Sequence, residues 1–402
     1  MMSDYAPPGL PNESRSTRRK VTIVSMNLST NCTNRCFRLA QALAPHFETE
    51  IVGTTFGVGK RWGEGVWPPL EGCADVSIKG VPGDYLPRYL RSIPKLLRLM
   101  DGDVIVACKP RFASLGIALL HKLIWRKPLI LDIDDDELAQ TMPGKQASLL
   151  KKLAHPGGYF WTRVIHPLHR FVNAKFVVSE NFRQRYGGTL IPHPLDPDEI
   201  DPARFDRSKV RREFGIRDDQ VVVGFIGTPG AQKGTDLLPE ALERIPDENL
   251  LIMIVGAELD DPYALEMKRR AGHRLLLVPM QPLARLPEFL AAADIVALPQ
   301  RATDETWGQM PAKLTDAMAM AKPIIAAERA DIPGYLAGGR GLTFPADDLD
   351  GLVKCLERLL AHRGEWATIG AAARAYFEDH LSYRAVGATM DAVIRALLVH
   401  RN

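Results

Sequence analysis

The sequence predicts an α/β protein built around two parallel sheets, and three observations indicate this class. Short β-branched or aliphatic runs alternate with longer helical patterns from residue 20 onward, which is typical of βα units. Segment 191–198 contains three prolines and divides this alternation into two series. The chain has 402 residues, which suffices for two to three domains of about 150 residues each.

Composition excludes several classes of protein. Hydrophobic residues make up 46% of the chain and charged residues 25%, which is typical of globular domains and excludes collagen, coiled coils and disordered tails. The net charge of +3 is too small for a dedicated nucleic-acid binder, so no nucleic-acid partner is expected. Five cysteines indicate a reducing compartment, and Cys32 and Cys36 are expected to be free thiols because no second pair stands at zinc-ligand spacing.

Each element is expected from its pattern of hydrophobicity, in chain order. The first series predicts strands at 21–25, 50–53, 104–107, 128–132 and 175–179. The second series predicts strands at 221–226, 250–255, 275–278, 295–298, 323–326 and 342–344. Helices are expected at 349–361, 366–380 and 383–398.

The expected domain boundaries follow from this order. Residues 1–19 are expected to be a disordered lead-in, since they lack the apolar run of a signal peptide. An N-terminal domain is expected at 20–196 and a C-terminal domain at 197–380, followed by a last helical segment at 381–402. Open parallel sheets bind ligands at the carboxyl ends of their strands, so the cleft between the domains is the expected site.

A strand at 221–226 leads into a glycine-rich turn that contains Gly227, Gly230 and Lys233, and a helix is expected to begin at about Thr235. Glycine lets backbone N–H groups approach an oxyanion, and a helix N-terminus and a lysine add positive charge. These features favour phosphate binding. A P-loop is excluded because the order is Gln-Lys-Gly-Thr. The alternative is an ordinary strand-to-helix turn with a solvated lysine.

A second segment, 304–326, places Lys313 and Asp316 three residues apart at the start of a predicted helix. Residues at this spacing share one face of a helix, so one cation and one carboxylate point together toward the strand ends. Such a pair is suited to hold a phosphate and a ribose diol. The alternative is an ion pair on the surface of the helix.

These two segments together resemble the family 4, or group 1, glycosyltransferases, which have two facing Rossmann-like domains with a cleft between them (the GT-B fold). Segment 227–236 resembles their glycine loop and "Lys-Gly-x-Asp" helix start, and 289–299 resembles one of their strands. Segments 311–319 and 322–326 resemble the family's donor motif. In the first half, segments 177–180 and 191–196 more loosely resemble the end of the family's N-terminal domain. The last predicted helix, 383–398, resembles the family's C-terminal helix, which crosses back to the N-terminal domain.

The resemblance implies a retaining transfer of a sugar from a nucleoside diphosphate to an acceptor, with the donor on the second domain and the acceptor on the first. No metal, cofactor or nucleophilic side chain is implied. The residues implied for donor binding are Gly227, Thr228, Gly230, Lys233, Gly308, Gln309, Met310, Pro311, Lys313 and Asp316. Those implied for catalysis are Lys233, Lys313, Asp134 and Glu305, and those for acceptor binding are Asn31, Asn34 and Asp132.

The chain departs from the family pattern at several positions. Gly308 stands where the family has the first of two glutamates, and Glu305 lies three residues earlier. Either Glu305 or the backbone N–H groups of 308–311 is expected to take over that role. Thr228 stands in place of a common arginine, which leaves Lys313 as the second cation, and Asp134 stands where many members have a histidine.

The carboxylate run 132–137 leaves an alternative open. Five carboxylates after a strand are suited to Mg²⁺ or Mn²⁺, as in metal-dependent glycosyltransferases of the other major fold or in phosphatases of the haloacid dehalogenase type. The phosphatase pattern has Thr or Val where Asp136 stands. The favoured interpretation is that one or two of these aspartates line the cleft and orient sugar hydroxyls.

Two further segments bear on the acceptor. The loop 25–35 lacks the family's glycines, and its asparagines and serines are expected to contact the acceptor. Segment 86–100 places four basic residues among leucines and contains no acidic residue, so it is expected either to touch a membrane surface or to be a solvated helix over the sheet. No run of about 18 apolar residues occurs, so any membrane contact is expected to be peripheral.

The expected enzyme is therefore cytoplasmic, and any contact with the membrane is expected at its inner face. Its acceptor is expected to be a glycan or a lipid-linked molecule in bacterial cell-surface polysaccharide or glycoconjugate synthesis. Two alternatives stay open. One is a sugar-nucleotide epimerase or hydrolase on the same fold. The other is a catalytically degenerate member that binds a nucleotide without turnover.

Overall fold

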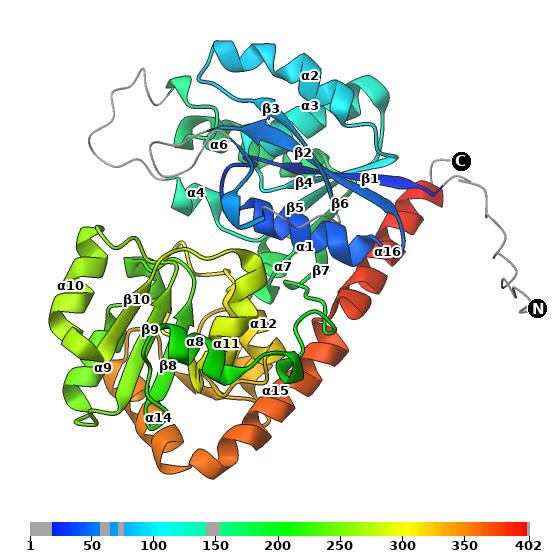
Figure 1. The fold of residues 1–402 in the computed structure, drawn as a ribbon. Helices are drawn as coiled ribbons and strands as arrows, with labels where there is room; N and C mark the ends of the chain where they lie inside the picture. Colours follow the sequence, from blue (N-terminus) through cyan, green and yellow to red (C-terminus); the bar gives the residue numbers. More distant parts are fainter. Residues whose placement is uncertain (1–17, 57–64, 71–75, 142–152, 400–402) are drawn as a thin grey trace, which may run out of the picture.

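Two parallel sheets, one above the other, organise the chain (Figure 1). The computed structural model describes residues 18–56, 65–70, 76–141 and 153–399. The first sheet has the order β3-β2-β1-β4-β5-β6-β7 and the second β10-β9-β8-β11-β12-β13. Every named strand pairing is parallel, so within each sheet all strands end at one edge.

The strands of the first sheet are β1 (Lys20–Ser25), β2 (Glu48–Thr55), β3 (Ser77–Pro82), β4 (Val104–Cys108), β5 (Leu129–Ile133), β6 (Ala174–Val177) and β7 (Thr189–Leu190). Those of the second are β8 (Val221–Ile226), β9 (Leu250–Val255), β10 (Leu275–Val278), β11 (Ile295–Leu298), β12 (Ile324–Ala327) and β13 (Leu342–Phe344). The central strands are buried on both faces, which explains their unbroken aliphatic runs.

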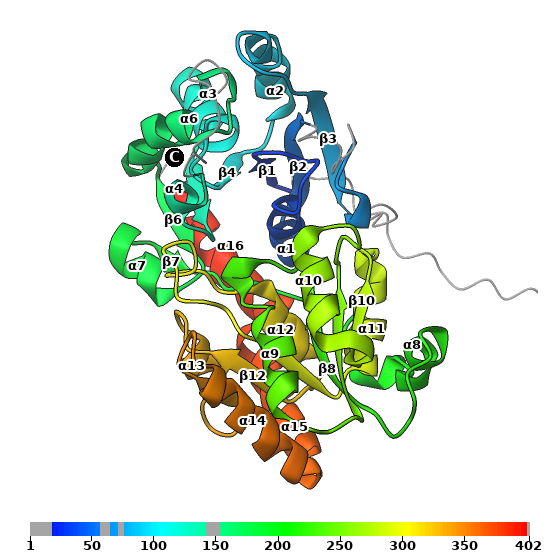
Figure 2. The same ribbon diagram turned by 90° about the vertical axis from the view of Figure 1, so that its left-hand side faces the viewer.

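Helices cover both faces of the first sheet. On one face lie α1 (Thr33–Leu43) and α16 (Tyr383–Val399), and on the other α2 (Ile93–Leu99) and α3 (Ile117–Trp125). Figure 2 shows α2, α3 and α6 on the side of the sheet away from α1. The remaining helices of this part are α4 (Glu137–Gln140), α6 (Tyr159–Ile165) and α7 (Glu180–Tyr186).

The second sheet is covered in the same way. On one face lie α9 (Leu237–Arg244), α10 (Pro262–Ala271) and α14 (Leu349–Ala361). On the other lie α8 (Arg207–Glu213), α11 (Leu286–Ala292), α12 (Ala312–Ala319) and α15 (Trp366–His380). The short helix α13 (Ile332–Leu336) packs against β12 and β13, and its Tyr335 ring contacts that of Tyr376 on α15. This is the two-layer covering that a doubly wound parallel sheet requires.

The last helix returns to the first sheet. Figure 1 shows α16 running from the part of the molecule that contains the second sheet back to α1. Val386, Met390 and Ile394 recur every four residues and are buried against the first sheet's core, and the Tyr383 hydroxyl contacts the side chain of Gln41 on α1. None of the described helices combines the length and the hydropathy needed to cross a bilayer.

The predicted strands of the second half coincide with the observed ones, except that β12 is shifted by one residue. In the first half, β1, β4 and β5 match the predicted strands within one residue at either end, and the prediction was wrong for four strands. The predicted strand 175–179 is Ala174–Val177, the predicted strand 50–53 extends to Glu48–Thr55, and the edge strands β3 and β7 were missed. The strand β3 is only partly buried, so its sequence lacks a hydrophobic run.

Candidate functional site

A cavity of about 480 Å³ lies between the two sheets. It is bounded by residues that follow β1, β4 and β5 of the first sheet and β8 and β11 of the second, at the carboxyl ends of these strands. It is lined by nine of the residues singled out from the sequence on the second domain, namely Gly227, Thr228, Lys233, Glu305, Gln309, Met310, Pro311, Lys313 and Asp316. From the first domain, Asn31, Asn34 and Asp134 line it.

The glycine-rich turn after β8 forms one wall of the cavity. Gly227 has φ of 138°, and a Cβ added to it would lie 2.2 Å from Lys313 Cε, so only glycine fits between the turn and that lysine. The turn continues through a short 3₁₀ helix, Ala231–Lys233, and Lys233 Nζ donates to the Thr228 carbonyl at 2.6 Å. The helix predicted to begin at Thr235 begins at Leu237, because Gly234 adopts a left-handed conformation between the two helical segments.

The donor motif forms the opposite part of the wall. Pro311 precedes the first turn of α12, with no side-chain cap on its N–H groups in the described structure. Lys313 is directed into the cavity with Nζ 5.4 Å from the ring centre of Phe225, and burial lowers its pKa. Asp316, one turn along, lines the same cavity. The spacing of three residues therefore brings the cation and the carboxylate together as expected.

Gly308 and Gly230 do not line the cavity. A Cβ at Gly308 would lie 2.5 Å from the Phe182 ring, and its carbonyl accepts from Ser179 Oγ at 2.6 Å, so this position joins the two domains. A glutamate has no space there. Glu305 is partly exposed and lines the cavity in its stead. The Gly230 carbonyl accepts from the Lys233 backbone N–H at 2.9 Å, so this glycine shapes the turn.

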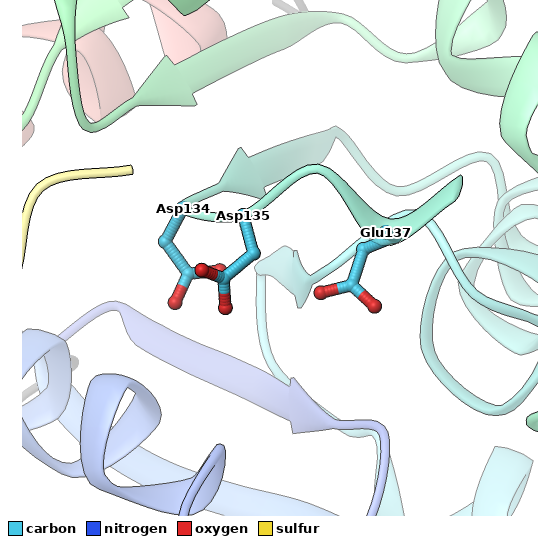
Figure 3. Close-up of side chains that lie close together, drawn as sticks. All are labelled: Asp134, Asp135 and Glu137. Carbon is cyan, nitrogen blue, oxygen red and sulfur yellow. The ribbon is translucent and has the colours of Figure 1, made fainter. Parts of the chain in front are cut away.

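Asp134, Asp135 and Glu137 are three of the four carboxylates that directly follow β5, and Figure 3 shows them turned to the same side of their loop. Their oxygens lie within 4.8 Å of one another. Lys109, at the end of β4, inserts its Nζ among them, 3.0 Å from Asp134 Oδ1, 2.8 Å from Glu137 Oε1 and in contact with Asp135. The ammonium therefore fills the space in which these oxygens would hold a divalent cation.

Asp132, predicted to bind the acceptor, lies behind this wall. It is fully buried and does not line the cavity. Its two oxygens accept from Arg35 Nη2 at 2.8 Å and Nε at 3.1 Å, and Arg35 also donates to the carbonyls of Ile191 and Pro192 at 2.8 Å. The prediction for Asp132 is therefore corrected, because this carboxylate compensates a buried arginine and holds the end of the first domain.

The loop after β1 keeps its shape without glycine through Asn27. The Asn27 carboxamide oxygen accepts from the backbone N–H groups of Ser29 and Phe56, and its NH₂ donates to the Phe56 carbonyl at 2.9 Å. This anchor places Asn31 and Asn34 at the cavity.

Cys32 and Cys36 are free thiols, and burial raises the pKa of Cys32 to about 11.

Several residues at the cavity were missed from the sequence. Arg38 reaches across from α1 to Asp316, with Nη2 2.7 Å from Oδ1. Asp135 was also missed, and its Oδ1 accepts from Nε2 of Gln309, one of the residues predicted at the donor, at 2.5 Å. The two domains therefore also meet at the carboxylates. His193 is buried beside Arg35, and burial together with Arg35 and Arg38 holds its pKa well below its usual range. Lys109 was detectable as the first polar residue after a buried strand, whereas Arg38 stands within a helix without a local signal.

Asp134 gives a first prediction. Burial raises its pKa from 3.8 to about 7, against the opposing effect of Lys109, so the folded chain retains a proton that the unfolded chain loses. Its contribution to stability is complete below the unfolded pKa and is lost as pH rises through about 7. Between pH 5 and pH 8 the wild type should lose about 2 kcal/mol of unfolding free energy relative to Asp134→Asn, measured by urea unfolding. Parallel pH profiles for the two proteins would refute this.

Comparisons with known proteins agree with this geometry. Residues 220–362 match the profile of "Glycosyl transferases group 1". A D-inositol 3-phosphate glycosyltransferase of Nocardia farcinica is 30% identical over 326 residues, covering 72% of this chain and 67% of that protein. The chain belongs to the group 1 glycosyltransferase family.

Other curated enzymes match only part of this group 1 protein, whereas a solved structure matches almost all of it. The same-named enzyme of Mycobacteroides abscessus is 34% identical over 181 residues, which is 43% of this chain and 39% of that enzyme. The chain spans about half the length of other curated relatives, 50% and 54% of two of them. The structure of Anabaena HepE in complex with UDP and glucose aligns over 94% of this chain and 99% of its own with a TM-score of 0.72 at 18% identity, which confirms the GT-B fold.

Proposed function

We propose that this group 1 protein is a retaining glycosyltransferase that moves a sugar from a nucleoside diphosphate to an acceptor held mainly by the first domain. One observation carries the proposal. Lys233, Lys313 and Asp316, from two separate segments, converge with the Gly227 turn on a single cavity whose other wall holds the asparagines of the first domain. The bound UDP and glucose of HepE support a nucleotide-sugar ligand for this fold.

The barrier to transfer is the departure of an anionic leaving group. Lys313, the N–H groups that begin α12 and the Gly227 turn would stabilise the charge that develops on the diphosphate. Lys233 would join them by turning from its own loop. Asp316 would accept the ribose hydroxyls. The acceptor hydroxyl would attack from the face of the leaving group and give its proton to the departing phosphate, so no side chain acts as nucleophile.

We propose that the reaction needs no divalent metal. The Lys109 ammonium already compensates the three carboxylates after β5, and the cations at the diphosphate come from lysine side chains. Asp134 and Glu305 then act as hydrogen-bond partners of the transferred sugar. Asn31 and Asn34 are proposed to contact the acceptor, because they line the wall that faces the donor side.

The acceptor is proposed to be a glycan or a lipid-linked glycan in cell-surface polysaccharide synthesis, with the enzyme at the inner face of the membrane. The face formed by a 3₁₀ helix, Arg88–Arg91, and α2 supports this, because Arg88, Arg91, Lys95 and Arg98 are all exposed. Tyr85 and Leu90 beside them are 50% and 52% exposed, which combines charge with apolar contact. Pro94 near the start of α2 explains why two short segments form here in place of one helix.

Nucleotide binding tests the donor site. Thermal unfolding is measured with UDP, GDP, dTDP or ADP, in EDTA or in Mg²⁺. At 100 times its dissociation constant a nucleotide should add about 2.7 kcal/mol of stability. We expect one nucleotide to stabilise the wild type equally in EDTA and in Mg²⁺, and Asp316→Ala to lose most of that response because the ribose contact is removed.

Two outcomes would contradict the donor assignment. If none of the four nucleotides raises the unfolding temperature, or if the response requires metal and persists in Asp316→Ala, the cavity is not a donor site of this kind. Once the nucleotide is known, turnover of its sugar form separates the remaining functions. Transfer should rise with added acceptor, whereas hydrolysis that no acceptor increases would indicate the epimerase class, and binding without turnover a degenerate member.

A further inference from the structure

Two arginines on the same side of α1 have different surroundings. Arg35 is saturated, since its guanidinium donates to Asp132 and to two backbone carbonyls. The side chain of Arg38, one turn later, is only 6% exposed and makes one hydrogen bond to the described residues, from Nη2 to Asp316. Its Nη1 is buried and has no hydrogen-bond partner among the described residues. A buried guanidinium N–H without an acceptor is costly, so a missing acceptor is expected at this point.

The surroundings of Arg38 define the charge of that acceptor. Arg38 and Lys313 both line the cavity, one from each domain, and Asp316, which accepts from Arg38, lines it too. Burial lowers the pKa of Lys313, Asp316 opposes this shift, and Arg38 adds to it. At this part of the wall two cations therefore stand beside the single carboxylate of Asp316. An anionic oxygen is the ligand that balances this charge.

We infer that Arg38 binds a phosphate oxygen of the nucleoside diphosphate from the first domain, with Nη2 held on Asp316 and Nη1 donated to the ligand. This inference rests on the proposed function. A planar guanidinium presents its N–H groups in a fixed fork, so its two terminal nitrogens can hold a carboxylate and a phosphate at the same time. The donor is then held by both domains, Asp316 and Lys313 on one side and Arg38 on the other.

A purely structural role for Arg38 is the competing explanation, in which the ion pair with Asp316 only joins the domains. Arg185 provides the matched control, because it also crosses between the domains. Its guanidinium lies 4.0 Å from the ring centre of Trp307, but it does not line the cavity. If domain contact alone mattered, Arg185→Met would weaken nucleotide binding as Arg38→Met does.

The test measures dissociation constants by titration calorimetry for the diphosphate that binds the wild type among UDP, GDP, dTDP and ADP, and for its parent nucleoside. We expect Arg38→Met to weaken the diphosphate about 10- to 100-fold and the nucleoside less than about 3-fold, since only the phosphate contact is lost. Arg185→Met should change neither constant by more than about 3-fold. Thermal unfolding without nucleotide checks that both variants are folded.

The outcomes separate this inference from the proposed function. A wild type that binds none of the four diphosphates overturns the proposed function. A wild type that binds one of them, with an Arg38→Met variant that binds it equally well, overturns the role of Arg38 alone. Equal losses for diphosphate and nucleoside would show that Arg38 only orients Asp316, and a loss in Arg185→Met as large as in Arg38→Met would show a role in domain contact. Each of these two results also overturns the inference.

Discussion

Replacing Lys313 with methionine is expected to lower kcat by about 10²- to 10³-fold while leaving the thermal stability unchanged or higher. Removing one preorganised contact to developing charge costs about 3–4 kcal/mol of transition-state stabilisation. Stability responds in the opposite direction because burial lowers the pKa of Lys313, which means that folding works against its charge. Methionine keeps most of the side-chain volume against the Gly227 turn.

Lys322 is the matched control for this variant. It follows the same helix, and burial lowers its pKa to about 8, but Nζ donates to the carbonyls of Ala291 at 3.0 Å and Ala293 at 2.8 Å, outside the cavity. Lys322→Met should therefore lower the unfolding temperature and leave kcat within about 3-fold, since it unpairs two carbonyls far from the chemistry. Steady-state kinetics and thermal unfolding on both variants check the pair. Equal kcat for Lys313→Met and wild type would contradict the role of Lys313.

The central strands of the second sheet were predictable because they are buried throughout. Val221–Ile226 and Leu250–Val255 are hydrophobic over almost their whole length, so a strand that packs on both faces is visible as a run with clear limits. The edge strand β3 of the first sheet lacks this signal. The residues of β3 are mostly exposed or half-buried, and this strand is defined by its pairing with β2, which no local pattern encodes.

The same difference between local and long-range signals separates the site residues that were predictable from those that were not. The turn at Gly227 and the start of α12 are each contained in a short segment, so Lys233, Lys313 and Asp316 were found from residue types and spacing. Arg38 contacts Asp316 across 278 residues, and Lys109 contacts Asp135 and Glu137 across 26 and 28 residues. Such contacts depend on how the domains and strands are packed. The prediction for Asp132 was wrong because its side chain is buried against Arg35. A run of acidic residues in the sequence does not reveal which of them is buried.

Lys109→Met should have the second largest effect, because it removes the cation that three carboxylates share. Uncompensated buried charge costs about 3–5 kcal/mol of stability, so in EDTA at pH 8 the variant should unfold at a lower temperature than the wild type. The difference in unfolding temperature should be smaller at pH 5, where Asp134 is protonated. Arg111 still pairs with Glu137, which keeps the fold attainable. Displacement of Asp134 from the transferred sugar should reduce kcat by about 10²-fold.

The vacated space gives this variant a property that the wild type should lack. Asp134, Asp135 and Glu137 hold oxygens within 4.8 Å of one another, which is a suitable ligand set for Mg²⁺ or Mn²⁺ once the ammonium is gone. We expect Mn²⁺ to raise the unfolding temperature of Lys109→Met and not that of the wild type or of Lys122→Met, whose Nζ bonds the Phe171 carbonyl outside the cavity. If Mn²⁺ stabilised the wild type equally, the lysine would not be the resident cation, and the metal-free mechanism would fail with it.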